Sequence, residues 1–329
     1  MAKNMIGIDI GSSRIKAAFL SGNSLKFCVS EAAPDNLVKN GGIVSWDAMA
    51  DELRNLIRKT GIRGKAAAIA MPSDEVYIRQ TDLPLMTIQQ LKVNLPYEFH
   101  DYITEDMDKY VYDYSVAGIE DKTMHLTAVA AGKALVGNYM DMCRRAKMDL
   151  KVLAPAVFAL KNIVENFEKL QGIKKGSRDY AFLDLGNANI KVHFFTRGQY
   201  EVTRIMDIGL QSLVDKLAEV KGNDPHIARI ELEQKQSELE GLPEITDLYD
   251  TMAVQVMRVL NFYNFNNPSN NIDTLYYYGG GAYIPKLLET IHETVQLPME
   301  KAGVLLPESL CGEEGFELLG LQAIGIAMA

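Results

Sequence analysis

The sequence predicts an α/β protein built from two similar halves. The stretch IDIGSSRIKAAF at 8–19 returns as LDLGNANIKVHF at 183–194, and the two align without a gap. Each copy shows a strand, a polar turn with glycine and a second, alternating strand, and each continues into a third strand-like stretch. A repeat at such a long period indicates a duplicated architecture. The residues that the copies share are Asp9/Asp184, Gly11/Gly186, Ile15/Ile190, Lys16/Lys191 and Phe19/Phe194.

The first half starts with this hairpin and is interrupted by an insertion. The segment 45–61 has helical spacing, with Ser45 as N-cap and Gly61 at the C-terminal end. KAAAIAMP then predicts a buried strand that ends at Pro72, and the mixed pattern that follows predicts an inserted α+β subdomain. The predicted boundaries are 1–72 for the first-lobe core, 73–152 for the insertion and 153–178 for an apolar helix that returns to the core.

The second half, 179–329, begins with strands and continues mainly with helices. Its later part contains the strand TLYYY, the segment GGGA and a further helix. A small charged subdomain is expected at about 210–250, and its middle, 221–245, has little apolar content, which is typical of solvated helix and loop. Apolar LLGLQAIGIAMA at 318–329 contains no Lys or Arg, so a buried helix is favoured over a membrane-seeking tail.

Composition excludes several classes of function. The net charge of −9 and the lack of long basic runs argue against nucleic-acid binding, because phosphate contacts need clustered Lys and Arg. The 3 cysteines are far apart and form no metal or disulfide pattern, which fits a reducing cytoplasm. The start of the chain shows no signal-peptide pattern, and no apolar run approaches the roughly 20 residues that span a bilayer. A cytoplasmic protein with protein or small-molecule partners is expected.

The turn of the first hairpin offers donors for an anion. Gly11 lets the backbone approach a phosphate closely, and the N–H groups and hydroxyls of Ser12 and Ser13 can donate to its oxygens. Asp9, at the end of the incoming strand, is a candidate ligand for hydrated Mg²⁺ beside those phosphates, and Lys16 can reach back as a point charge. The alternative is a tight hairpin turn in which the Asp accepts hydrogen bonds from nearby backbone N–H groups.

The second hairpin supplies a matching set of groups. Asp184 is its candidate metal ligand, and Gly186, Asn187 and Asn189 provide close approach and amide donors. Two such hairpins can clamp the phosphates of a nucleotide from both sides.

The glycine segment is the third candidate element. A surface without side chains, on which a planar base or a sugar can lie, is offered by Gly279, Gly280 and Gly281. The helix expected to start near Ala282 or Tyr283 leaves free N–H groups at its N-terminus. The alternative is a flexible strand-to-helix connection, since glycine-rich turns are common.

The order of these segments resembles the nucleotide-binding plan of the actin, heat-shock-70 and sugar-kinase superfamily. The order is first hairpin, helix APAVFALKNI, second hairpin, GGGA segment and terminal helix. The resemblance covers nearly the whole chain. It identifies the hairpins as phosphate-1 and phosphate-2 segments, the glycine segment as an adenosine motif, and the two helices as connecting helices. It implies an actin-like, ribonuclease-H-like duplicated fold with two lobes around a nucleotide cleft, and binding of ATP or ADP with Mg²⁺.

The insertion is similar to that of the cell-division protein FtsA, and finer features resemble the related PilM family of type IV pilus and competence machines. In that family an MP…R…LP pattern opens the insertion and a helix with Glu follows. An Arg and a Gly-containing turn follow phosphate-2, and the ending is similar to AIGIAMA. The matching residues are Met71, Pro72, Arg79, Leu83, Pro84, Tyr97, Glu98, Arg204 and Gly209.

Three positions depart from the superfamily pattern. Ala188 replaces the second glycine of phosphate-2, which implies a less close approach to phosphate. Pro155 precedes the first connecting helix where actin has a water-orienting glutamine, so fast hydrolysis is not expected. Proline is also acceptable in the first turn of a helix, which explains Pro155 without any catalytic argument. Pro96 falls inside the helix of the insertion and should kink or break it.

The resemblance implies a cytoplasmic ATP-binding scaffold of a type IV pilus or pseudopilus machine, at most a weak ATPase. Its implied partner is the cytoplasmic tail of an inner-membrane PilN-like protein, which would hold it at the inner face of the membrane. The tail is expected in a groove between the first-half core and the insertion, with exposed apolar and aromatic residues of VYIRQTDLPLM at 76–86 and the next helix as candidates. The alternative is that these aromatic residues form the core of the insertion. A pilus ATPase and further copies of the chain are additional candidate partners.

Two alternatives within the same fold remain open from the sequence. An FtsA-like filament former would carry a basic amphipathic tail, which this sequence lacks. A small-molecule kinase would need a general base, usually an Asp, in a substrate pocket, and no such Asp is identified. No catalytic residue is assigned.

Overall fold

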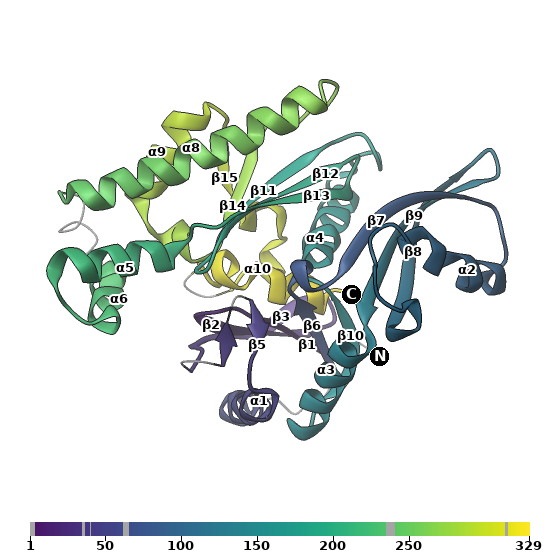
Figure 1. Cartoon of the computed structure of the whole chain (residues 1–329), viewed down its shortest axis with the longest axis horizontal. Coiled ribbons are helices and arrows are strands. Elements are labelled where there is room, and N and C mark those ends of the chain that lie inside the picture. Colours follow the sequence, from purple (N-terminus) through teal and green to yellow (C-terminus); the bar gives the residue numbers. More distant parts are fainter. Residues whose placement is uncertain (1–3, 35–36, 40, 62–65, 235–240, 313–314) are drawn as a thin grey trace. The chain divides into compact units, whose positions relative to one another are not determined.

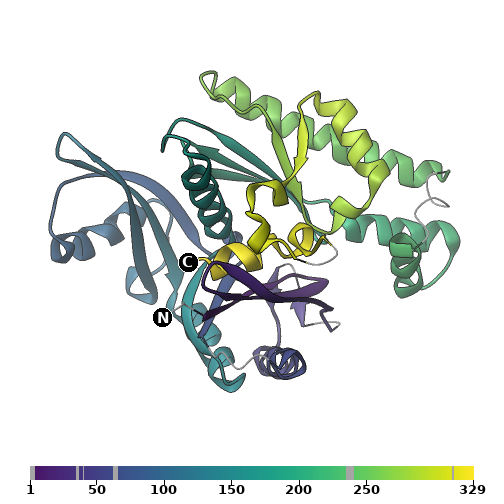
Figure 2. The same cartoon turned by 180° about the vertical axis from the view of Figure 1, so that it is seen from behind.

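The computed structural model describes residues 4–34, 37–39, 41–61, 66–234, 241–312 and 315–329. The chain forms two compact units (Figures 1 and 2). The first unit comprises Met1–Ile10, Arg14–Asn162 and Gln322–Ala329, and the second comprises Gly11–Ser13 and Ile163–Leu321. The turn of the first hairpin therefore groups with the second unit.

A five-stranded sheet forms the core of the first unit, in the order β10-β6-β1-β2-β3. The first three strands in the chain are antiparallel neighbours, whereas β1, β6 and β10 run parallel. Helices α1 and α3 lie on one apolar face, where Ile8, Leu53 and Tyr139 are fully buried (Figure 1). The bounds are β1 (Asn4–Ile10), β2 (Arg14–Ser21), β3 (Ser24–Ala32), β4 (Val38–Lys39), β5 (Gly42–Ile43), α1 (Trp46–Thr60), β6 (Ala66–Met71), η1 (Ser73–Glu75), α3 (Lys133–Arg145) and β10 (Asp149–Pro155).

The predicted helix at 45–61 is confirmed as α1. It ends at Gly61, which has φ 66° and donates its N–H to the carbonyl of Arg58. This left-handed conformation favours glycine, because a Cβ is strained there. Ser45 occupies the N-cap position, but its side chain makes no capping hydrogen bond.

The insertion forms its own three-stranded antiparallel sheet in the order β7-β9-β8, with a separate apolar core around Phe99 and Leu126. As predicted, Pro96 ends the α-helix: α2 stops at Asn94 and a 3-10 turn continues. Arg79 and Glu98 of the family pattern form an ion pair with N–O 3.9 Å. The bounds are β7 (Tyr77–Pro84), α2 (Ile88–Asn94), η2 (Leu95–Phe99), η3 (Met107–Lys109), β8 (Tyr110–Glu120) and β9 (Thr123–Gly132).

The second unit repeats the sheet of the first. Its strand order is β13-β12-β11-β14-β15, with three antiparallel strands followed by two parallel additions. The repeated sequence thus produces repeated topology. The bounds are α4 (Ala156–Gln171), which continues from the first unit, β11 (Tyr180–Leu185), β12 (Ile190–Thr196), β13 (Gln199–Met206), α5 (Leu210–Lys221), α6 (Pro225–Gln234), α8 (Pro243–Asn266), β14 (Leu275–Tyr278), η4 (Gly280–Tyr283), α9 (Pro285–Val295), β15 (Met299–Lys301), η5 (Ala302–Leu305) and η6 (Glu308–Leu310).

The charged stretch 221–245 is helical on both sides of residues 235–240, which lie outside the described part of the chain. The long helix α8 starts at Pro243, earlier than its apolar pattern indicates, because proline is well accepted in the first turn of a helix.

The terminal helix α10 (Phe316–Ala327) is buried, as predicted, with Ala323, Ile324 and Ile326 fully covered. Its last turns pack on β1 at Gly7, where an added Cβ would lie 1.9 Å from the carbonyl oxygen of Ala323. No helix in the described ranges is long and apolar enough to cross a membrane.

His193 is a buried histidine on β12. Its Nδ1 lies 2.8 Å from Oγ1 of Thr203, while Nε2 is buried without a hydrogen-bond partner. Burial, with a smaller contribution from Lys191, lowers the pKa of His193 from 6.5 to about 3. The folded chain therefore holds this imidazole neutral.

This burial predicts a loss of stability in mild acid. The pKa of His193 is lower in the folded chain than in the unfolded chain. Its contribution to the free energy of unfolding is therefore complete above pH 6.5 and falls at lower pH, where the unfolded chain takes up the proton. The free energy of unfolding should drop by about 2 kcal/mol between pH 7 and pH 5 through this group, and His193→Gln should remove that part of the slope. Urea unfolding at both pH values measures it. His226→Gln, at an exposed position, is the control, and an unchanged slope in His193→Gln would contradict the assignment.

Candidate nucleotide site and peptide pocket

The first hairpin brings Asp9 and Lys16 together. The two residues are direct cross-strand neighbours on β1 and β2, and Lys16 Nζ lies 2.9 Å from Asp9 Oδ2. Asp9 is only 9% exposed. The ammonium group of Lys16, a candidate phosphate contact, thus balances the charge of Asp9, the candidate metal ligand.

The second hairpin has the same register. Asp184 on β11 is paired with Lys191 on β12, as Asp9 is paired with Lys16. The shared Asp and Lys of the sequence repeat therefore occupy equivalent positions in the two sheets. This equivalence follows from the length of the turn, since a shift of one residue would place the two side chains on opposite faces.

The turn of the second hairpin packs against the start of α5. Leu210 N donates to the carbonyl of Gly186 at 3.1 Å, and Gln211 N donates to that of Asn187 at 2.9 Å. A Cβ on Gly209 would lie 2.5 Å from the Asn187 oxygen, so only glycine allows this contact. The first N–H groups of α5 thus hold the turn and are not directed at a ligand.

Within the turn, Gly186 is also required by close approach, because its Cβ would lie 2.6 Å from the carbonyl oxygen of Asn189. Ala188 is exposed.

The glycine segment packs on the same turn. Gly279 has φ 97°, and its Cβ would lie 2.8 Å from the oxygen of Leu185 and 2.9 Å from Asp184 Oδ1. Cβ atoms on Gly280 and Gly281 would meet Leu210 at 2.9 Å and Leu185 at 2.8 Å respectively. The three glycines therefore allow tight packing between η4 and the turn of the second hairpin, a role that the prediction of a base-binding surface did not include.

Free N–H groups are also expected at the glycine segment, and this expectation is wrong for two of them. Gly279 N donates to the carbonyl of Leu318 at 2.7 Å, and Ala282 N donates to that of Gly279 at 3.1 Å. The α-helix α9 starts only at Pro285, after the 3-10 turn. The tight conformation of the glycines uses these donors inside the protein.

Two turn residues from distant parts of the sequence meet in the second unit. Asn187 Nδ2 donates to Ser12 Oγ at 3.3 Å. Arg229 on α6 donates to Asn187 Oδ1 at 3.0 Å and also to Gln211 Oε1. Arg229 lies in the charged stretch that shows no functional signal in the sequence. Gly11, Ser12 and Ser13 are all partly buried.

The carboxylates of the two hairpins can bind a metal ion only together with ligands from outside the protein. The described residues contain no group of three His, Cys, Asp or Glu that could hold a metal by themselves. Each hairpin offers one carboxylate, Asp9 or Asp184, and Mg²⁺ commonly keeps its waters and binds through one or two carboxylates and the phosphates of a substrate. The donor set therefore fits Mg²⁺ that arrives with a nucleotide.

Pro155 is the last residue of β10, immediately before α4, and it is buried. Ser73 Oγ accepts a hydrogen bond from Val157 N at 3.4 Å, in the first turn of α4. Position 155, immediately before this helix, thus presents no side chain that could orient water.

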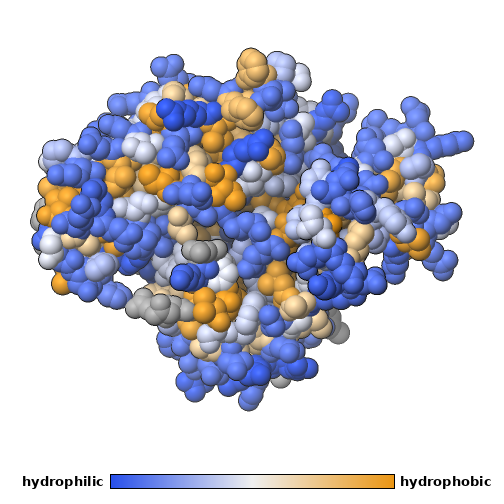
Figure 3. Space-filling model, in the orientation of Figure 1, coloured by the Kyte–Doolittle hydropathy of each residue, from blue (hydrophilic) through white to orange (hydrophobic). Residues whose placement is uncertain are grey.

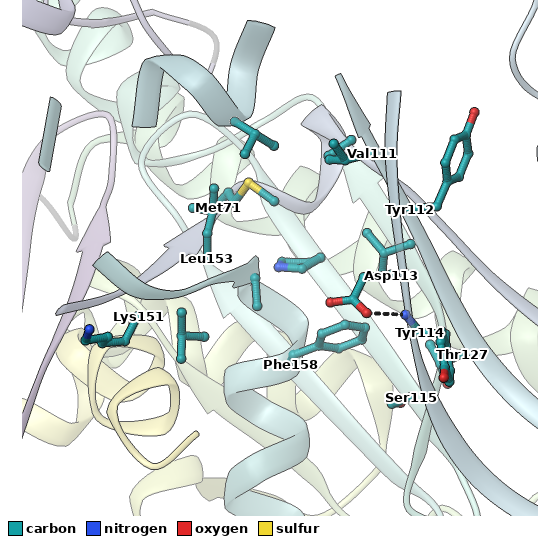
Figure 4. A pocket seen from close by; sticks show the side chains of 16 residues that line it. Met71, Val111, Tyr112, Asp113, Tyr114, Ser115, Thr127, Lys151, Leu153 and Phe158 are labelled. Carbon is teal, nitrogen blue, oxygen red and sulfur yellow. Dashed lines mark hydrogen bonds between the residues drawn. The ribbon is translucent and has the colours of Figure 1, made fainter. Parts of the chain in front are cut away.

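A pocket of about 640 Å³ lies inside the first unit, between the core sheet and the insertion (Figure 4). Its two long sides are β8 and β10, each the edge strand of its own sheet. In Figure 4, Met71, Leu153 and Phe158 lie on one side and Asp113 points toward them from β8. The lining residues are Met71, Val111, Tyr112, Asp113, Tyr114, Ser115, Thr127, Val129, Ala131, Val136, Lys151, Val152, Leu153, Ala154, Pro155 and Phe158.

The pocket is mainly apolar but has polar groups along β8. Asp113 Oδ1 accepts from Tyr114 N at 2.8 Å, the bond drawn in Figure 4. Lys161 Nζ on α4 donates to Ser115 Oγ at 3.4 Å. Because edge strands carry backbone groups that point away from their sheets, this pocket suits an extended peptide.

None of the candidate groove residues at 76–86 lines this pocket. Leu85, Ile88 and Tyr97 are 55%, 64% and 68% exposed on the insertion, and Figure 3 shows hydrophobic residues there among hydrophilic ones. A pocket thus lies between the core sheet and the insertion, where a groove is expected, but strands other than the candidate segment 76–86 line it.

Comparison with solved structures confirms the actin-like fold. The chain is similar to a structure titled PilM-PilN type IV pilus biogenesis complex, with TM-score 0.83, 18% identity and coverage of 100% of this chain and 98% of the other. It is also similar to the ethanolamine utilization protein EutJ from Carboxydothermus hydrogenoformans, with TM-score 0.62, 15% identity and coverage of 100% and 90%. MreB 5 of Spiroplasma citri bound to AMPPNP gives TM-score 0.56, 11% identity and coverage of 99% and 95%.

A family model described as type IV pilus assembly protein PilM matches residues 7–304, well over half of the chain. The predicted resemblance is thereby confirmed, and the chain belongs to the PilM family of type IV pilus assembly proteins.

Proposed function

We propose that this chain is an ATP-binding, actin-like scaffold of a type IV pilus assembly machine that binds the cytoplasmic tail of a PilN-like partner. Family membership and the likeness to a PilM-PilN complex support this role. The observation that carries the proposal is the pocket between the edge strands β8 and β10. Neither a filament-forming cell-division protein nor a small-molecule kinase is favoured by the family match.

The pocket indicates the form of the tail. Residues 111–115 and 151–155 line its two sides, so it follows each strand over a short segment. At about 3.3 Å per residue, that length accommodates an extended segment of about five residues. Apolar side chains of the tail would contact Met71, Leu153 and Phe158, and its backbone would hydrogen-bond to one of the two edges. The tail of an inner-membrane protein would then hold the scaffold at the cytoplasmic face of that membrane.

The two hairpin turns and the glycine segment form the proposed nucleotide site. Ser12 Oγ accepts from Asn187, which leaves its hydroxyl hydrogen available to a phosphate oxygen. Asp184 in this site and, taken by itself, Asp9 at the end of β1 are the two candidate ligands for Mg²⁺, which would supply positive charge to the phosphates when it is bound. Because Pro155 stands in the sequence where actin has its water-orienting glutamine, the chain should bind ATP or ADP and hydrolyse ATP slowly.

Calorimetric titration tests the proposal. The N-terminal cytoplasmic peptide of the PilN-like protein from the same organism is titrated into the full chain, with and without ATP and Mg²⁺. Saturable binding is expected, and a peptide of the same composition in scrambled order is the control. No binding under either condition would contradict the scaffold role.

A further inference from the structure

We propose that Arg229 positions the side chain of Asn187 so that its amide nitrogen, and not its oxygen, faces Ser12 and the phosphates of a bound nucleotide. The proposal rests on the proposed nucleotide site. It assigns a role in that site to α6, a helix that contains neither a hairpin turn nor the glycine segment.

The chemistry of the guanidinium group fixes the orientation of the amide. A guanidinium donates hydrogen bonds and accepts none, so the atom of Asn187 that faces Arg229 must be Oδ1. The distance from an Arg229 terminal nitrogen to this oxygen is 3.0 Å. Nδ2 therefore points the other way, and it donates to Ser12 Oγ at 3.3 Å. Without Arg229 the amide could turn and present its oxygen to the phosphates, which would repel them.

Arg229 is itself held in place by α5. Its other terminal nitrogen donates to Gln211 Oε1, and Gln211 Nε2 donates to Asp215 Oδ1 at 2.8 Å. Each of these hydrogen bonds, from Asp215 at one end to Ser12 at the other, therefore joins one donor to one acceptor. Arg229 is partly buried and forms no ion pair with a carboxylate within the described ranges. Its positive charge next to the turn thus also favours an anion there.

A double-mutant cycle in nucleotide binding tests the role. The dissociation constants of ATP with Mg²⁺ and of inorganic tripolyphosphate are measured for the full chain and for Asn187→Ala, Arg229→Met and the double variant. Each single change should raise the dissociation constants of both ligands about tenfold. The double variant should also show a rise of only about tenfold over the wild-type chain, because both changes remove the same donor. Arg229→Lys, which can still donate to Asn187, should recover part of the affinity.

Arg258→Met on α8 is the matched control, since it removes an exposed arginine from the same unit, and it should leave both dissociation constants unchanged. Thermal unfolding without ligand shows whether each variant is folded, and Arg229→Ala replaces Arg229→Met if the latter is not. Losses that multiply in the double variant, or unchanged binding in Arg229→Met, would overturn the positioning role alone. Failure of the wild-type chain to bind either ligand would overturn the nucleotide site as well.

Discussion

Replacing Gly7 by alanine is expected to lower the free energy of unfolding by about 3 kcal/mol, the upper part of the usual range for an overfilled core position. The new methyl group would lie 1.9 Å from the carbonyl oxygen of Ala323 and 2.8 Å from the Cβ of Ala327. The nearest obstacle is backbone, so α10 itself must move away from β1. Chemical denaturation of the full chain measures the effect.

Gly137→Ala is the control for this prediction. Gly137 lies inside α3, and its added Cβ would meet nothing within 4 Å. Alanine is the better helix former, so this change should raise stability by up to about 1 kcal/mol. If Gly7→Ala is as stable as the wild-type chain, the close packing of α10 on β1 is wrong.

Replacing Val111 by glutamate is expected to weaken binding of the partner tail about 30-fold, which is about 2 kcal/mol of binding free energy. Val111 lines the pocket on β8 and is 40% exposed, so the chain can accept a polar residue there without loss of its fold. A bound tail, however, would bury the new carboxylate against apolar side chains and leave it without a partner. Calorimetric titration with the tail peptide measures the change.

Val116→Glu is the matched control. Val116 is on the same strand, is 46% exposed and does not line the pocket. The dissociation constant of the Val116→Glu variant for the tail peptide should stay within about twofold of the wild-type value. Equal weakening by both substitutions would show that charge on β8, and not the pocket, determines binding.

The repeated topology could be predicted from the sequence because the repeat itself carries the register. In each hairpin the short turn makes the Asp and the Lys direct neighbours on adjacent strands, Asp9 with Lys16 and Asp184 with Lys191. Such local geometry depends only on chain connectivity and the alternation of side chains along a strand.

The contacts of the glycines and of Arg229 could not be predicted in this way. Arg229 meets Asn187 across 42 residues of sequence, and the contact depends on how α5 and α6 fold back on the turn. Likewise, the pattern GGGA indicates close approach but not what approaches. The structure shows that Leu185, Asp184 and Leu210 do so.

The pocket shows a different limit. The apolar residues at 76–86 suggest a groove in the sequence, whereas the pocket is lined mainly by β8 and β10, which lie in separate sheets and come together only in the tertiary structure. A sequence pattern can indicate that a single residue is apolar and exposed. It does not indicate which two strands, here β8 and β10, come together to form the walls of a pocket.

Amide hydrogen exchange with the tail peptide bound tests the central proposal most directly. If the tail lies between the two edge strands, added peptide should slow exchange in residues 110–120 and 149–155, and it should leave β7 (Tyr77–Pro84) unchanged. Protection confined to β7 and α2, or no protection in either edge strand when the peptide is bound, would contradict the assignment of the pocket as the binding site of the partner.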